Sequence, residues 1–213
     1  MKVHTFICSA MERHGVPMTM ADFIRGCEHG TWRHQVEAVR NSGDIEGTKK
    51  MLPALVPGLS VEYDLPLVRR GEGRQSGYLV LDYDHLTDPE QYAVIWNQLA
   101  ACPHIAAVCR SAGGNGIFAV LVYNTDFVMQ KEDGTAKESW NFNSVLAELR
   151  KNDIIPDGFD TRCNDLPRLR FVSYDPQAFY RDAVPLQLDI TERRYIKPRC
   201  RKETVEYDVT IVQ

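Results

Sequence analysis

The sequence has no apolar run near the length of about 20 residues that a membrane-spanning helix requires. Its first residues lack the charged-then-apolar pattern of a secretory signal. The six cysteines form no CxxC pair, so neither a zinc ribbon nor a thioredoxin-like site is indicated. We therefore expect a cytoplasmic protein with reduced thiols and no membrane partner.

Two other signatures are missing. There is no GxxxxGK[S/T] loop, so no helicase or ATPase domain is predicted within this chain. The six histidines show no metal-ligand spacing, so zinc is not predicted. The formal net charge of −4 argues against a protein that nucleic acid covers broadly, because nonspecific binding depends on Lys and Arg. Any contact with nucleic acid must be local.

The composition is that of a soluble globular chain, with 213 residues of which 44% are hydrophobic and 25% charged. An apolar hairpin with helices interspersed along the chain favours the α+β class over a doubly wound sheet. We expect a domain over 1–190, made of an N-terminal α/β part (1–76) and a core (77–190), followed by an extension over 191–213. The expected helices cover 18–30, 31–44, 89–102 and 137–152, and the expected strands cover 3–9, 60–63, 78–83, 104–111, 116–124, 168–176, 186–190 and 207–212.

The stretch GYLVLDYDH (77–85) joins an apolar run to two acids, Asp82 and Asp84. On a strand, residues i and i+2 point to the same side, so two carboxylates leave the strand end facing one place. Oxygen ligands of this kind suit Mg²⁺ or Mn²⁺, and a cation removes the repulsion between them. A strand that simply ends in two solvated acids is the alternative.

A second stretch, CRSAGGNGIFAVL, places Ser111, Gly113, Gly114 and Gly116 in a turn between two strands. Small residues let backbone N–H groups approach a phosphate, and Arg110 would neutralise part of its charge. A plain hairpin turn is equally compatible with these residues.

A third stretch, GFDTRCNDLPRLRFVSYDP, carries Asp160 together with Arg162, Arg168 and Arg170. A third carboxylate beside a metal-binding pair is what a two-metal site for phosphoryl or nucleotidyl transfer needs. The alternative is a solvated loop followed by an ordinary strand.

In this order, LVLDYD, SAGGNGIFAVL and FDTRCNDLPRLRFVSYDP resemble the archaeo-eukaryotic primase (primase-polymerase) superfamily. They are most similar to the N-terminal domain of virulence-associated protein E-like proteins and their bacterial relatives, and KKMLPAL fits the same group. The resemblance implies a core with an RNA-recognition-motif-like mixed or antiparallel sheet flanked by helices. It also implies two Mg²⁺ or Mn²⁺ ions, a nucleoside triphosphate substrate, a DNA or RNA template or primer, and a separate or fused helicase or ATPase.

The resemblance assigns roles to individual residues. The metal ligands and catalytic acids would be Asp82, Asp84 and Asp160. The nucleotide would contact Arg110, Ser111, Gly113, Gly114, Gly116 and Arg168. Lys49 and Lys50, in KKMLPAL, are candidate contacts to nucleic-acid phosphates. The basic run LVRRGEGR adds Arg69 and Arg70 on the ground of its charge, and a solvated loop is the alternative there.

One position departs from the superfamily. Phe118 stands where its members usually have a histidine that contacts the phosphates of the nucleotide, and phenylalanine cannot donate a hydrogen bond. Our main hypothesis is a metal-dependent primase-polymerase-type nucleotidyltransferase that acts in replication of a mobile element or phage. The alternative is an inactive module of the same fold that binds a nucleotide or single-stranded nucleic acid. A glycosyltransferase with a DxD metal site is disfavoured, because no nucleotide-binding βαβ unit precedes the acids.

Overall fold

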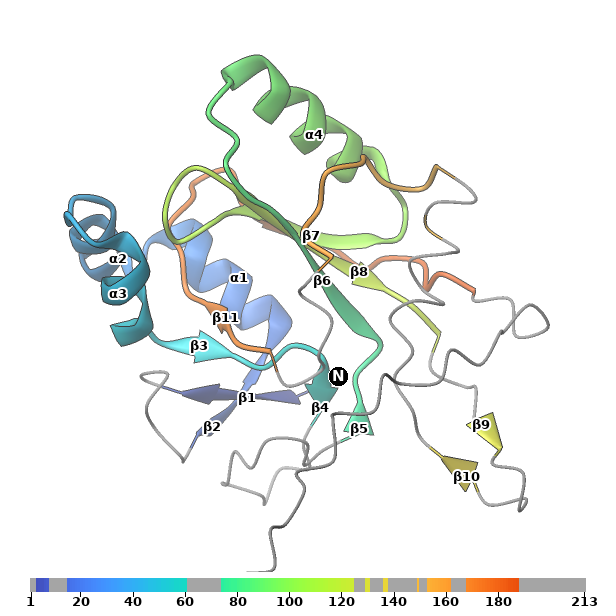
Figure 1. Cartoon of the computed structure of the whole chain (residues 1–213). Helices are drawn as coiled ribbons and strands as arrows, with labels where there is room; N and C mark the ends of the chain where they lie inside the picture. The colour runs from blue at the N-terminus through green and yellow to red at the C-terminus, as the bar shows by residue number, and fades with distance from the viewer. Residues whose placement is uncertain are drawn as a thin grey trace, which may run out of the picture.

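The computed structural model describes residues 3–7, 15–60, 74–124, 129–130, 136–137, 149, 153–161 and 168–187. Within these residues it has four α-helices and two four-stranded sheets, with every strand pair antiparallel. This arrangement confirms the expected α+β class (Figure 1). No helix of the described part is long and apolar enough to cross a membrane.

The central sheet has the strand order β12-β7-β8-β6. Its strands are β6 (Tyr78–Tyr83), β7 (Ile105–Arg110), β8 (Ile117–Val122) and β12 (Phe179–Tyr180). Every residue of β8 is buried, because both faces of the sheet are covered. One face packs against α4, and the other packs against α1 and the N-terminal half of the chain. The predicted hairpin of two apolar strands is confirmed as β7 and β8.

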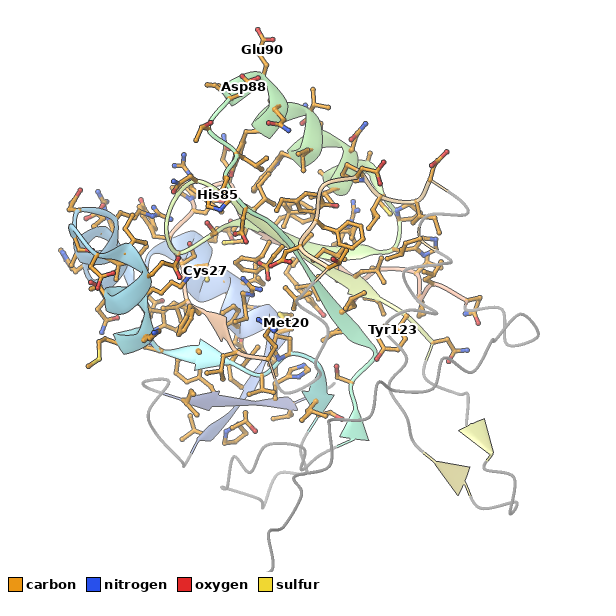
Figure 2. All side chains as sticks on the ribbon, viewed as in Figure 1. Met20, Cys27, His85, Asp88, Glu90 and Tyr123 are labelled. Carbon is orange, nitrogen blue, oxygen red and sulfur yellow. The ribbon has the colours of Figure 1, made fainter. Side chains whose placement is uncertain are left out.

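Helix α4 (Pro89–Ala101) also forms as predicted. Proline suits the first turn, and the Asp88 carboxylate accepts a hydrogen bond from the backbone N–H of Glu90 at 2.9 Å. Both acids lie at the outer end of the helix, away from the sheet (Figure 2). Ile95 and Leu99 are buried against the central sheet, and so fix the helix on that face.

The N-terminal sheet has the order β11-β3-β1-β2. Its strands are β1 (Val3–Ile7), β2 (Val16–Thr19), β3 (Ala54–Leu55) and β11 (Arg170–Phe171). The chain between β2 and β3 forms α1 (Met20–His29), α2 (Arg33–Arg40), α3 (Ile45–Thr48) and the 3₁₀ helix η1 (Lys49–Met51). Two small pairs, β4 (Leu59–Ser60) with β5 (Arg74–Gln75) and β9 (Met129–Gln130) with β10 (Ala136–Lys137), complete the described strands.

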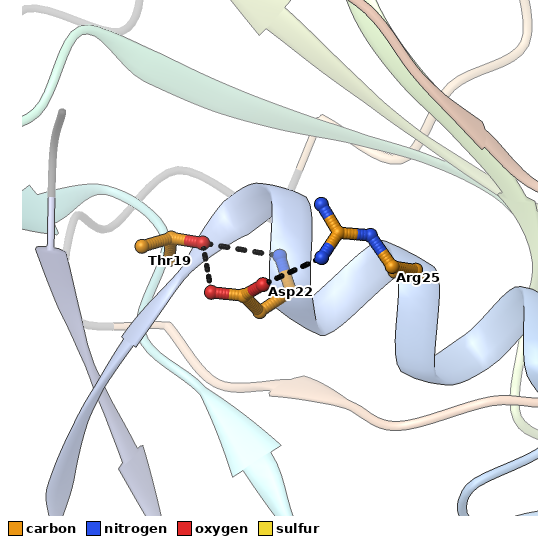
Figure 3. A network of polar contacts seen from close by, with 3 residues as sticks. All are labelled: Thr19, Asp22 and Arg25. Carbon is orange, nitrogen blue, oxygen red and sulfur yellow. Dashed lines mark hydrogen bonds and ion pairs between the residues drawn. The ribbon is translucent and has the colours of Figure 1, made fainter.

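Helix α1 (Met20–His29) lies within the expected helix over 18–30. The Thr19 hydroxyl accepts a hydrogen bond from the backbone N–H of Asp22 at 3.1 Å. The same hydroxyl donates a hydrogen bond to the carboxylate of Asp22 at 2.6 Å. Arg25 pairs with the other carboxylate oxygen of Asp22 (Figure 3). Gly30 ends the helix with φ of 78°, a conformation that glycine adopts without strain.

Two short strands differ from expectation. Residues 16–19 form β2, where the sequence pattern predicts the start of a helix at residue 18. The strand expected over 168–176 is limited to the two residues of β11. The expected helix over 137–152 and the expected strands over 60–63, 186–190 and 207–212 lie wholly or mostly outside the described residues. The domain boundary at residue 190 therefore stays a prediction.

Candidate functional site

The two acids of the DYD stretch lie at the end of β6. Asp82 pairs with Phe118 of β8 and is buried, with 6% of its surface exposed, whereas Asp84 follows the strand and is exposed. Directly opposed residues of an antiparallel pair share a face of the sheet. Phe118 packs in the core cluster that contains α1 and β1, so Asp82 faces the N-terminal half of the molecule.

Asp160 is attached directly to this strand. Its backbone N–H donates a hydrogen bond to the carbonyl oxygen of Asp82 at 2.7 Å. The flanking segment is anchored by Phe159, whose ring meets Tyr83 edge-on at 6.2 Å, and by the Tyr83 hydroxyl, which donates to the carbonyl of Pro156 at 2.8 Å. The third acid of the sequence prediction is therefore held beside the first.

Arg170 brings a cation to the acids from the N-terminal sheet. Its Nη2 donates to the carboxylate of Asp82, and its guanidinium carbon lies 5.1 Å from the centroid of the Phe118 ring. The side chains of Arg170 and Asp82 are 14% and 9% exposed. The Arg170 Nε is buried and has no hydrogen-bond partner among the described residues. Because Arg170 belongs to β11 and Asp82 to β6, the candidate site lies between the two sheets.

The pKa of Asp84 responds to the charged groups around it. Its pKa is raised above the ordinary value, first because surrounding protein atoms desolvate its carboxyl group although the residue as a whole is exposed. The negative charges of Asp82 and Asp160 raise the pKa further, while Arg170 opposes them. A divalent cation would therefore relieve repulsion at Asp84.

The glycine-rich turn packs directly against the backbone at the end of β6. The backbone N–H of Ser111 donates to the carbonyl of Gly116 at 2.8 Å, which closes the turn, and Gly114 adopts a φ of 92°. A Cβ at Gly116 would lie 2.6 Å from the carbonyl oxygen of Tyr83 and 3.5 Å from the Cα of Asp84. Glycine is required at this close approach, and the structure thus brings the second predicted stretch onto the first.

Arg40, in the last turn of α2, holds this turn in place. Its guanidinium donates to four acceptors at 3.0–3.2 Å: the carbonyls of Ser111, Ala112 and Tyr174, and the hydroxyl of Ser173. The turn is thereby joined to the FVSYDP stretch. The sequence does not predict this role, because an arginine near a helix C-terminus is common and its neighbours carry no signal of a tertiary contact.

The side chain of Arg110 is not brought to the acids. Arg110 pairs with Ile117, whose side chain faces α4, and its guanidinium lies over the Tyr92 ring at 5.8 Å. Its backbone N–H donates to the buried carboxylate of Asp175 at 2.8 Å. Asp175 also accepts from the backbone N–H of Gln177, so this acid of the SYDP stretch has a structural role.

The other predicted residues lie around this arrangement. Lys49, in η1, pairs with Glu46 at 2.6 Å, and Lys50 beside it is exposed. Gly113 lies near Ile45 of α3, and Arg168 is exposed two residues before Arg170. Arg69, Arg70 and Arg162 lie outside the described residues.

The donor set fits Mg²⁺ or Mn²⁺ in its chemistry, since these ions prefer oxygen and are commonly held by one or two carboxylates plus phosphates of the substrate. In the described part of the chain, no three Asp, Glu, His or Cys side chains are arranged so that they could coordinate one ion. Asp82 is engaged by Arg170 instead. Asp82, Asp84 and Asp160 are the residues that could hold a cation, once Asp82 is released.

Comparison with known proteins gives one result. The model of the family described as BT4734-like, N-terminal domain, matches residues 68–180, more than half of the 213-residue chain. The matched span contains the acid pair, the glycine-rich turn and both Asp160 and Arg170. No curated protein and no solved structure matches the chain. With these residues inside the match, the chain belongs to the BT4734-like N-terminal domain family.

Proposed function

We propose that this protein is a metal-dependent nucleotidyltransferase of primase-polymerase type that acts in the replication of a mobile element or phage. The observation that carries the proposal is a convergence of three separate stretches. The acid-bearing end of β6 receives a backbone hydrogen bond from Asp160 and close packing from Gly116. These are the stretches that resemble the primase-polymerase superfamily, in the same order.

Each part has a defined task in this proposal. Asp82, Asp84 and Asp160 hold Mg²⁺ or Mn²⁺, and such ions, when bound, supply the charge that activates an attacking hydroxyl and stabilises a pyrophosphate leaving group. The turn over 111–116 presents backbone close to the triphosphate, because its small residues leave room for phosphate oxygens. Lys49, Lys50, Arg69 and Arg70 are the proposed contacts to template or primer phosphates. A separate or fused helicase or ATPase is the proposed protein partner.

The second candidate is a module of the same fold that binds nucleotide or single-stranded nucleic acid without turnover. Two observations favour it. Arg170 is ion-paired with Asp82, and Phe118 stands in place of a residue that could donate a hydrogen bond to phosphate. Three carboxylates in one place count against it, since phosphate binding alone gains nothing from negative charge.

The first test is calorimetric titration of Mn²⁺ together with a nonhydrolysable deoxynucleoside triphosphate. Asp84→Asn is the most informative variant, because removing Asp82 would leave the buried Arg170 guanidinium without its partner and would destabilise the fold. Asp182→Asn is the matched control, since Asp182 is exposed and follows β12, at the opposite edge of the central sheet from β6.

The nucleotidyltransferase proposal requires that the wild type and Asp182→Asn bind both ligands and that Asp84→Asn loses most of the Mn²⁺ affinity. Primer extension by the wild type would then separate the enzyme from the inert module. If neither ligand binds to the wild type, the acids hold no metal-nucleotide complex, and both the nucleotidyltransferase and a nucleotide-binding module are excluded.

A further inference from the structure

Arg170 is in an unusual position for a residue that only stabilises the fold. It lies between an acid and an aromatic ring, with Nη2 on the Asp82 carboxylate and its guanidinium over Phe118. Its Nε, also buried, has no hydrogen-bond partner among the described residues. A buried N–H without a partner is costly and requires an explanation. An acceptor that arrives with a ligand would provide one.

The pair between Arg170 and Asp82 also opposes cation binding. A divalent ion at Asp82 would meet the positive charge of the guanidinium at the same carboxylate oxygen. The cation and Arg170 therefore compete for Asp82, unless the arginine moves to another anion. A planar ring surface beneath the guanidinium permits such a movement, because stacking is retained while the N–H groups change their partner.

We propose that Arg170 exchanges partners: it binds Asp82 when no divalent cation is present, and it binds a phosphate group of the nucleotide once a cation is held by the carboxylates. Arg170 thus supplies from above the ring the phosphate contact that Phe118 cannot make. The inference rests on the proposed function, because it requires that the site binds a cation and a polyphosphate.

The chemistry of the side chain supports phosphate as the second partner. Guanidinium N–H groups form a rigid fork that matches two oxygens of a phosphate. In Arg170, Nε and Nη2 would donate together, which satisfies the buried Nε. The two arginines that the resemblance assigns to the nucleotide are less well placed than Arg170, since Arg110 lies over Tyr92 on the α4 side and Arg168 is exposed.

The test compares two binding reactions in the same variants. The probes are Mn²⁺ alone and inorganic tripolyphosphate in saturating Mn²⁺. Arg170→Met removes the charge, and Arg170→Lys keeps the charge without the fork. The matched control is Arg33→Met, because Arg33 also pairs with an acid, Glu37, and lies over an aromatic ring, Tyr174, at 4.9 Å.

Loss of the Arg170 side chain should change the affinities for Mn²⁺ and for tripolyphosphate in opposite directions. Arg170→Met binds Mn²⁺ about tenfold more tightly, since the competitor for Asp82 is gone, and binds tripolyphosphate about tenfold or more weakly. Arg170→Lys keeps a Mn²⁺ affinity near that of the wild type and still loses tripolyphosphate affinity. Arg33→Met matches the wild type in both reactions. A purely structural role would weaken both reactions together, and that result overturns the inference.

A measurement on the wild type covers the case in which Arg170→Met does not fold. The Nε–H resonance of Arg170, assigned by its absence in Arg170→Lys, is followed by NMR with Mg²⁺ as a diamagnetic cation. The chemical shift of this resonance should change, and its proton should exchange more slowly with water, when tripolyphosphate is added. An unchanged resonance in a protein that binds tripolyphosphate would overturn the proposed change of partner by Arg170, but not the proposed metal-nucleotide site. Failure of the wild type to bind Mn²⁺ or tripolyphosphate overturns the proposed function as well.

Discussion

The backbone N–H of Asp160 and the carbonyl oxygen of Asp82 form a hydrogen bond of 2.7 Å between two segments far apart in the chain. β6 is an edge strand of the central sheet, so this carbonyl is accessible to a neighbouring segment. Backbone pairing fixes the position of Asp160 without using its carboxylate. The third acid is therefore positioned by the fold while its side chain is left to other contacts.

The Tyr83 hydroxyl should control how firmly this segment is held. Tyr83→Phe removes its hydrogen bond to the carbonyl of Pro156 and should lower the free energy of unfolding by about 1 kcal/mol. The amide of Asp160 should also exchange faster with solvent, as local opening becomes easier. Tyr92→Phe on α4 is the control and should leave this amide unchanged. Equal exchange rates in wild type and Tyr83→Phe would show that the anchor lies elsewhere.

The close approach of the glycine-rich turn to β6 predicts a specific intolerance. Gly116→Ala places a Cβ 2.6 Å from the Tyr83 carbonyl oxygen, a backbone atom that cannot move aside freely, and should destabilise the protein by about 1–3 kcal/mol. Gly43→Ala is the control, because no atom beyond its chain neighbours lies within 4 Å of the added methyl group, and its stability should be unchanged or raised. Urea denaturation of both variants measures the difference, and equal midpoints would contradict it.

Arg40 should matter more for stability than an average helix arginine. Arg40→Met removes four hydrogen bonds and leaves carbonyls of the turn without a donor, so we expect a loss of at least about 2 kcal/mol. Arg25→Met is the matched variant, since Arg25 is 61% exposed and its ion pair should contribute less than about 1 kcal/mol. Thermal unfolding compares them, and a similar small loss in both would refute the role of Arg40.

Local patterns explain which parts of the fold the sequence predicts well. The apolar run that ends in Asp82 and Asp84, the glycine-rich reversal, and the cap and proline before α4 are all signals within a few residues. β2 was not predicted because Pro17 disfavours a strand interior. The structure tolerates it because β2 is an edge strand.

The arrangement of side chains between the sheets could not be predicted in the same way. A register irregularity between Ile105 and Ala107 breaks the alternation along β7, so the face taken by Arg110 cannot be counted from the start of the strand. Arg168 and Arg170 are equivalent by sequence pattern, and only tertiary packing brings Arg170 to Asp82. The resemblance assigned Arg168 to the nucleotide, and that role stays a prediction.

Buried tyrosines should make the protein sensitive to alkaline pH. Burial raises the pKa of Tyr92 to about 12, and it raises those of Tyr78, Tyr83 and Tyr123 above the ordinary value. Above pH 10 the unfolded chain therefore loses protons that the folded chain keeps, so stability is full below pH 10 and falls as the pH rises towards 12. Urea midpoints across this range should fall.

Absorbance at 295 nm gives the matching titration. Of the nine tyrosines, Tyr92 should ionise at about pH 12, and Tyr78, Tyr83 and Tyr123 should ionise well after an ordinary tyrosine or only on unfolding. Tyr92→Phe should remove one of the late steps and leave the early ones. Ionisation of all nine tyrosines near pH 10 in a protein that is still folded would contradict the burial described here.

The Cys109 thiol should react very slowly with alkylating agents in the folded protein, although Cys109 lies next to Arg110. Burial raises the pKa of its thiol, and a hydrogen bond with Cys27 raises it further. Figure 2 labels Cys27, which belongs to α1. Because the thiolate is the reactive form, alkylation of Cys109 by iodoacetamide should be roughly a hundredfold slower in the native protein than in urea. Cys27 and Cys102, also buried and free, should be protected with it. Peptide mapping by mass spectrometry distinguishes the sites, and native labelling of Cys109 at the rate seen in urea would mean that the packing of α1 against β7 opens readily.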